Sequence, residues 1–199
     1  MTINDKEDQL KLDELYYYKV IDRLAHLSKS SMFTSVVVAL LVCTVFWGRV
    51  ETWILAAWIV TLLITILVRA ALIRRFWRLD LENSCLRCWA RRYVILIYCS
   101  AACWGFLPFL DIFSSQDWAR SFLIFVAAGT SSGGMVSLHP LLNAAIPYVL
   151  IILVPMMIVL AQGPELSLIV MAIMGGFYCI SLVRSTFLLN KASHDSIRK

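Results

Sequence analysis

Side chains that could perform catalysis or hold a metal are scarce in this chain of 199 residues. Inside a membrane, metal sites, haem sites and proton relays need paired His, Asp or Glu side chains. The three histidines, His26, His139 and His194, lie beside the apolar stretches rather than within them, so no two of them can hold a haem between helices. We therefore predict no catalytic residue, no metal site and no cofactor in these residues.

Cys85 and Cys88 form a CxxC pair, which is found at zinc and redox sites when a second pair accompanies it. No second pair follows in the sequence. Two reduced cysteines in an arginine-rich loop are the simpler interpretation. A metal or redox role stays open as the alternative.

Small residues and hydroxyl groups gather in the run AAGTSSGG, where Gly129 and Gly133 are four residues apart. This spacing allows tight packing inside one protomer, a dimer contact, or room for a ligand. Hydroxyl groups in hydrocarbon need partners. Bonds to the preceding turn of the same helix would satisfy them without a ligand.

Prolines and a few polar side chains mark the place where a ligand could enter the bundle. Proline bends a helix because it removes a backbone donor, and bent helices can line a pocket. We predict that any ligand enters between the third, fourth and fifth apolar stretches. The residues expected to line this site are Trp104, Pro108, Asp111, Thr130, Ser131, Ser132, Pro147 and Tyr148.

The composition is that of a membrane protein. The chain is 60% hydrophobic and 16% charged, with a mean hydropathy of +0.78, whereas soluble domains are roughly 45–50% apolar and about 25% charged. So few polar residues cannot cover a core on all sides in water. This excludes a disordered protein, a collagen-like fibre and a disulfide-stapled secreted module.

Six charge-free stretches approach the length of about 20 residues that a helix needs to cross the hydrocarbon of a bilayer. Their apolar character is continuous rather than alternating, which indicates helices and not the strands of a barrel. We predict an all-α, polytopic protein with a transmembrane domain at 31–189 and the start of a cytosolic connector helix at 190–199. The six stretches are Met32–Trp47, Trp53–Val68, Tyr93–Leu110, Ser121–Leu138, Ala144–Ala161 and Leu166–Val183.

Residues 1–30 are charged and do not have the pattern of a cleaved signal peptide. Within them, Tyr17, Ile21, Leu24 and Ser28 share one stripe at helical spacing. We predict an N-terminal interfacial amphipathic helix on the inner leaflet. It would act as a simple anchor or as a coupling element that touches a cytosolic partner.

The basic residues are distributed unevenly. Of the 18 Lys and Arg residues, all except Arg49 and Arg120 fall on one side of the six predicted spans. Loops rich in Lys and Arg stay in the cytoplasm, so we predict a multi-pass protein of the bacterial inner membrane with both termini cytoplasmic. Basic side chains beside anionic headgroups account for the net charge of +5 without nucleic-acid binding.

A resemblance rests on the order of the segments and on the placement of their small residues, Pro and Trp. The segments are RLAHLSKSSMFTSVVVALLVCTVFW, RAALIRRFWR, WARRYVILIYCSAACWGF and AGTSSGGMVSLHPLLNAAIPYVLIILVPMMIVLAQGPE, and the tail is LLNKASHDSIRK. Together they resemble the N-terminal six-helix transmembrane sensory region of bacterial membrane-bound signalling proteins. Such proteins continue into a diguanylate cyclase, a cyclic-di-GMP phosphodiesterase or a sensor histidine kinase of a two-component system.

The resemblance implies a sensor or input module that relays a signal through its last helix to a cytosolic output domain. The expected partners are the lipid bilayer, a second copy in a homodimer, the output domain and an unidentified small-molecule or lipid ligand. Any enzymatic activity would belong to a C-terminal output domain that these residues do not include. The alternatives are a small membrane transporter or channel, for which no internal repeat or paired buried charge is evident, and a membrane enzyme.

Overall fold

The computed structural model describes residues 3–78, 86–109 and 117–198, and the regular structure in these ranges is helical, with no strand. Each of the long helices contains a segment long and apolar enough to cross a membrane. The prediction of an all-α protein with six such spans is therefore confirmed. The helices are α1 (Ile3–Phe46), α2 (Thr52–Phe76), α3 (Leu86–Gly105), α5 (Asp117–Leu138), α6 (Leu142–Ala161) and α7 (Leu166–Arg198).

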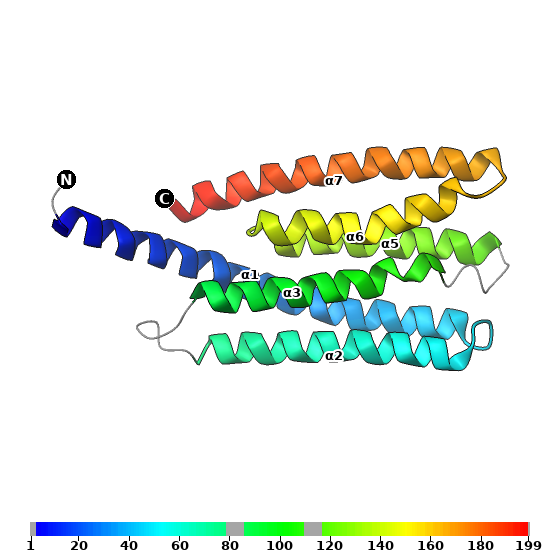
Figure 1. Ribbon diagram of the computed structural model, residues 1–199, viewed down its shortest axis with the longest axis horizontal. Helices are drawn as coiled ribbons and strands as arrows, with labels where there is room; N and C mark the ends of the chain where they lie inside the picture. Colours follow the sequence, from blue (N-terminus) through cyan, green and yellow to red (C-terminus); the bar gives the residue numbers. More distant parts are fainter. Residues whose placement is uncertain (1–2, 79–85, 110–116, 199) are drawn as a thin grey trace.

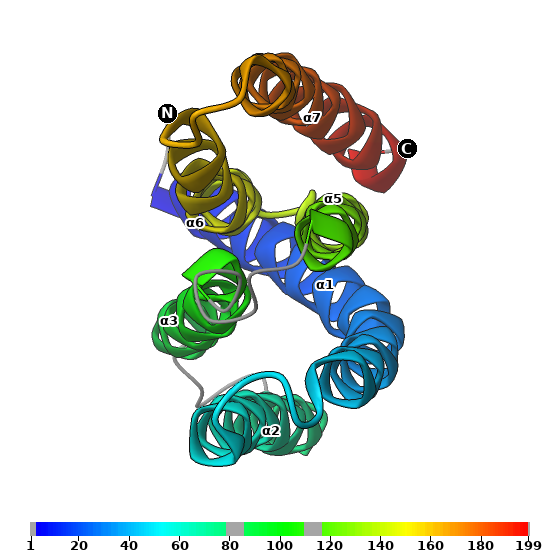
Figure 2. The ribbon, with the colours of Figure 1, turned by 90° about the vertical axis from the view of Figure 1, so that its right-hand side faces the viewer.

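Successive helices run up and down, so both chain ends lie at the same end of the bundle (Figure 1). We call this the N/C end, and it also carries the short His139–Leu141 turn between α5 and α6. Seen along its length, the bundle is elongated in cross-section, with α7 at one edge and α2 at the other (Figure 2). Helix α6 lies inside it and packs against α3, α5 and α7.

Large apolar side chains cover much of the outside of the bundle. Phe33, Leu67 and Phe177 are among the exposed ones, and α1 and α7 bury less of their spans than the inner helices do. So much contiguous apolar surface is rarely exposed to water by a soluble protein. Lipid chains, in contrast, are as apolar as the side chains that they touch. The exposed surface is therefore that of a bundle surrounded by lipid.

Helix α1 joins two elements that the sequence analysis treated separately. Residues 10–28 and the first span form one continuous helix, because no Pro or Gly interrupts the chain before Gly48. Ile21, Leu24 and Ser28 do share a face, and all three are fully buried within the bundle. This stripe therefore packs on protein, and the segment does not form a separate helix along the membrane surface.

The end of α1 that leads to the N/C end is held against α2 by aromatic and polar contacts. The Trp77 indole donates a hydrogen bond to the Asp22 carboxylate over 3.4 Å, and the Lys29 ammonium lies 3.9 Å from the centre of the Trp77 ring. The rings of Tyr18 and Phe76 stack 5.4 Å apart. Helix α2 thus continues beyond Val68, where the sequence analysis ended the second span, to reach these partners.

Candidate ligand-binding groove

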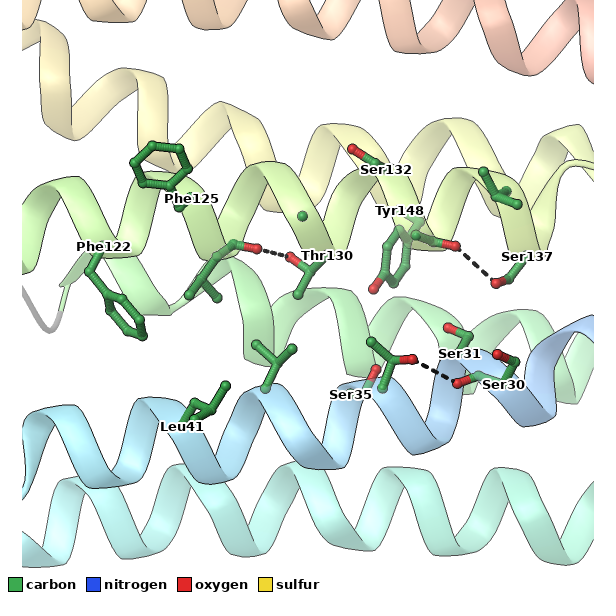
Figure 3. Close-up of a pocket in the computed structure, with 17 residues that line it drawn as sticks. Ser30, Ser31, Ser35, Leu41, Phe122, Phe125, Thr130, Ser132, Ser137 and Tyr148 are labelled. Atoms are coloured by element: carbon green, nitrogen blue, oxygen red, sulfur yellow. Dashed lines mark hydrogen bonds between the residues drawn. The ribbon is translucent and has the colours of Figure 1, made fainter.

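A cavity of about 660 Å³ lies between α1 and α5, and Tyr148 of α6 closes part of it (Figure 3). This volume falls in the range of roughly 300–1,000 Å³ that is usual for small-molecule sites. Phe125 of α5 lines the cavity and is 78% exposed. The cavity is therefore a groove that opens sideways, toward the lipid-facing surface of the bundle.

Glycines of α5 create both the space and one wall of the groove. A Cβ atom on Gly129 or Gly133 would meet nothing within 4 Å. A Cβ atom on Gly134 would instead lie 2.1 Å from the Tyr148 ring, so only glycine lets this ring pass α5. Of the interpretations left open for Gly129 and Gly133, the structure favours room beside the helix over tight packing within the protomer.

Four hydroxyl groups of α5 are satisfied within their own helix. Thr130 donates to the Val126 carbonyl over 2.8 Å, and Ser137 donates to the Gly133 carbonyl over 2.9 Å. Ser131 and Ser132 also bond to carbonyl groups one turn back, each over 2.7 Å. Bonding to the preceding turn, which the sequence analysis considered, therefore accounts for these hydroxyls without a ligand.

Four hydroxyl groups that line the groove lack such partners, namely those of Ser30, Ser31, Ser35 and Tyr148. Tyr148 is only 5% exposed, its ring points from α6 toward α1 (Figure 3), and its hydroxyl forms no hydrogen bond with any residue in the described ranges. Ser31 and Ser35 of α1 likewise form none there, although Thr34 between them donates to the Ser30 carbonyl over 3.1 Å. Ser31 and Ser35 are half-buried. The groove thus presents unused hydrogen-bonding capacity.

Helix α7 is hydrogen-bonded to the helix that lines the groove. The Tyr178 hydroxyl donates to the Ala128 carbonyl over 2.9 Å and also contacts the Ser132 hydroxyl. Nearer the N/C end, the Asn190 amide donates to the carbonyls of His139 and Pro140, over 2.7 and 3.2 Å. The last helix is therefore connected to α5 and to the turn that follows α5.

The predicted site residues are only partly brought together. Thr130, Ser132 and Tyr148 line the groove, whereas the other described members lie elsewhere. The Trp104 ring is buried edge-on against Trp58, with the ring centres 5.7 Å apart. The remaining members are Ser131 and Pro108, which are buried away from the groove, Pro147 within α6, and Asp111, which lies outside the described residues.

The groove also differs in location from the predicted site, because α1 and not α3 forms its second wall. Sequence reasoning missed the α1 contribution, which comes from the hydroxyl-rich run SKSSMFTS. The available signal was the spacing of Ser31, Thr34, Ser35 and Val38, which places them on one side of a helix. The groove residues of α1 are Ser30, Ser31, Thr34, Ser35, Val38 and Leu41.

Arg69 is the second feature that the sequence analysis placed differently. It was counted among the basic residues of the cytoplasmic side, but in α2 it is only 4% exposed. Its guanidinium donates a hydrogen bond to the Tyr93 hydroxyl over 3.2 Å and lies 5.4 Å from the centre of that ring, while its Nε atom has no partner in the described part of the chain. The Tyr93 ring in turn stacks on Trp89 at 5.0 Å. A charge is therefore held inside the bundle by aromatic side chains.

Metal-binding groups do not converge in the described ranges, where no three His, Cys, Asp or Glu side chains could hold an ion. Cys43, Cys99, Cys103 and Cys179 are free thiols. Cys88 is disulfide-bonded, which differs from the interpretation of two reduced cysteines. Cys85 lies outside the described residues.

Comparisons with known proteins identify no relative. No family model, curated protein or solved structure matches this chain. Any function must therefore be argued from the groove, the buried side chains and the connection to α7.

Proposed function

We propose that this chain is the membrane input module of a bacterial signalling protein, in which occupancy of the groove changes the position of α7. The observation that carries the proposal is the pair of hydrogen-bonded connections from α5 and its following turn to α7, through Tyr178 and Asn190. Helix α7 then continues unbroken to Arg198 at the N/C end. A rigid helix that contacts the groove wall and leaves the bundle is suited to pass a displacement to a cytosolic output domain.

The relay needs two states, and we take these to be the empty and the occupied groove. Filling the space beside Gly129 and Gly133 would change how α5 lies against α1. Ser132, on the same helix, contacts Tyr178 of α7. A ligand shifts an equilibrium only by its difference in affinity for the two states, and small helix shifts of this kind are a common form of switching.

The output is proposed to be cyclic-di-GMP turnover or histidine kinase activity, and the active form is proposed to be a homodimer. Such outputs act in pairs, and a two-fold axis would bring two α7 helices together. Support for this comes from the apolar outer face of α7, where Phe177, Ile180 and Leu188 are exposed.

Transport is a second candidate function, and Arg69 is the observation that favours it. Ionisable side chains inside a membrane often mark a substrate or ion pathway. Arg69 contacts Tyr93 rather than the groove, which argues for a structural role. Transport would be favoured over sensing if vesicles that contain the purified protein take up a solute, and if this uptake is lost in an Arg69→Met variant that still folds.

Both termini are proposed to face the cytoplasm. The N/C end carries Arg74 and Arg75 in the last turn of α2, whereas Arg49, Glu51 and Glu165 lie at the opposite end. A reporter that is active only in the periplasm should give a signal when fused after Gly48 or Gly163. A reporter that is active only in the cytoplasm should give a signal when fused after Arg78 or Arg198. The reverse pattern would refute this orientation.

A chimera tests the relay. The chain is joined after its last residue to the output part of a histidine kinase, with one to four residues inserted to rotate the junction. Kinase activity should vary with the helical period, because α7 transmits its orientation. Tyr178→Phe should change basal activity about two- to tenfold, as expected for one net hydrogen bond.

The control is Ile64→Leu, since this exposed side chain lies on α2, away from both α7 and the groove. It should leave the activity of the chimera unchanged. Equal activity in all junction variants, together with no effect of Tyr178→Phe, would contradict the relay.

A further inference from the structure

The groove is polar at one end and apolar at the other (Figure 3). Ser30, Ser31 and Ser137 lie toward the N/C end, whereas Leu41 and Phe122 lie at the other end. Tyr148 and Ser35 lie between them. The groove therefore has the polarity of an amphiphile, with its head toward the N/C end.

The polar end offers hydrogen bonds without charge. Among the described residues that line the groove, none is Asp, Glu, Lys, Arg or His. A charged head placed there would lose its hydration without contacting a charged side chain of the lining. The hydroxyls of Ser31, Ser35 and Tyr148, which lack partners, can each donate or accept a hydrogen bond. An uncharged head that bears oxygen fits this end.

The apolar end fits a single chain. The whole groove, from Ser30 to Leu41, extends about 17 Å along α1 at 1.5 Å per residue, a length that takes the head and the first part of an acyl or alkyl chain. Leu41 and Phe122 flank this part, and Phe125 stands at the open side. A ligand can thus enter laterally from the bilayer.

The head should determine selectivity. Lipid chains are as apolar as the groove walls, so transfer of the chain from bilayer to groove gains little hydrophobic energy. In the groove, the hydroxyl or ester oxygen of the head exchanges the hydrogen bonds that it forms at the bilayer surface for bonds to the unused hydroxyls of the lining. Each net hydrogen bond corresponds to a change of about two- to tenfold in affinity.

We propose that the groove binds a single-chain lipid with a small, uncharged, oxygen-bearing head, such as a long-chain alcohol or fatty-acid ester. The head lies against Ser31, Ser35 and Tyr148, and the chain runs along Val38 and Leu41. The role of this lipid as the input signal rests on the proposed function, whereas its binding does not.

Binding is measured with radiolabelled hexadecanol and the purified chain in lipid nanodiscs, with unlabelled competitors. Hexadecanol and methyl palmitate should compete, palmitate ionised at pH 9 should compete at least about tenfold more weakly, and hexadecane should not compete. Tyr148→Phe should weaken hexadecanol binding about two- to tenfold, since it removes one hydrogen bond. Gly133→Leu should abolish binding by filling the groove, and its Cβ atom meets open space.

The matched control is Thr44→Val, because Thr44 is on α1 outside the groove and its hydroxyl bonds to the Leu41 carbonyl. It should bind hexadecanol like the unmodified chain. Competition by hexadecane as strong as by hexadecanol, tighter binding of palmitate, or full binding by both Tyr148→Phe and Gly133→Leu would overturn the proposal. Binding with no response of the kinase chimera would instead reject the sensor function and leave the lipid site standing.

Discussion

Gly105→Ala should destabilise the protein by about 3 kcal/mol, near the upper end of the range for overpacked cores. A Cβ atom at this position would lie 2.3 Å from the Ile151 carbonyl oxygen. Because that oxygen belongs to the backbone of α6, the clash can be relieved only if α3 and α6 move apart. Thermal unfolding of the purified protein in detergent should show a Tm lower by about 10 °C.

Gly129→Ala is the control for this substitution. It is also a helix-interior Gly→Ala change in a neighbouring span, but its Cβ atom meets nothing within 4 Å. Alanine is favoured over glycine in helices by roughly 1 kcal/mol, so the Tm should stay the same or rise. Equal losses in the two variants would show that the close approach of α3 to α6 does not limit stability.

The second large effect concerns the buried guanidinium of Arg69. Tyr93→Phe should cost about 3 kcal/mol, because it removes the hydroxyl that accepts a hydrogen bond from this charge and leaves the charge buried. Arg69→Met should cost less although it removes the charge, since methionine fills similar space and needs no partner. The double variant should be about as stable as the unmodified protein.

A double-mutant cycle by thermal unfolding in detergent measures this coupling. The expected coupling energy is about 3 kcal/mol, so Tyr93→Phe should have little effect in the Arg69→Met background. Thr61→Val is a suitable control, because Thr61 lies on the same helix and is exposed. Purely additive effects of the two substitutions would show that Tyr93 does not stabilise the charge.

The six spans could be predicted from the sequence because their length and apolar character are local properties. About 20 apolar residues are needed to cross the hydrocarbon, and each stretch approaches that length by itself. An even number of spans also places both ends of the chain at the same end of the bundle (Figure 1). The boundaries were less predictable. Helix α1 begins far before Met32, and α2 continues past Val68, where Arg69 contacts Tyr93 and Trp77 contacts Asp22.

The location of the candidate site could not be predicted, because it depends on which residues are neighbours in the folded bundle. Thr130, Ser132 and Tyr148 were identified from their types, but the groove lies against α1, whose hydroxyls were not considered. Gly129 and Gly133 have the spacing of a packing motif, yet Gly105 and Gly134 make the close approaches.

The sequence alone determined that this chain forms six apolar helices with its basic residues concentrated at one end, because hydrophobicity and charge act on each segment separately. The tertiary structure decided which helices are neighbours, where the space between them lies and that Arg69 is buried. In a soluble helix one apolar stripe indicates the buried face. Helices in lipid are apolar on all sides, so their pattern does not reveal which face meets another helix, and close packing of particular side chains makes that choice.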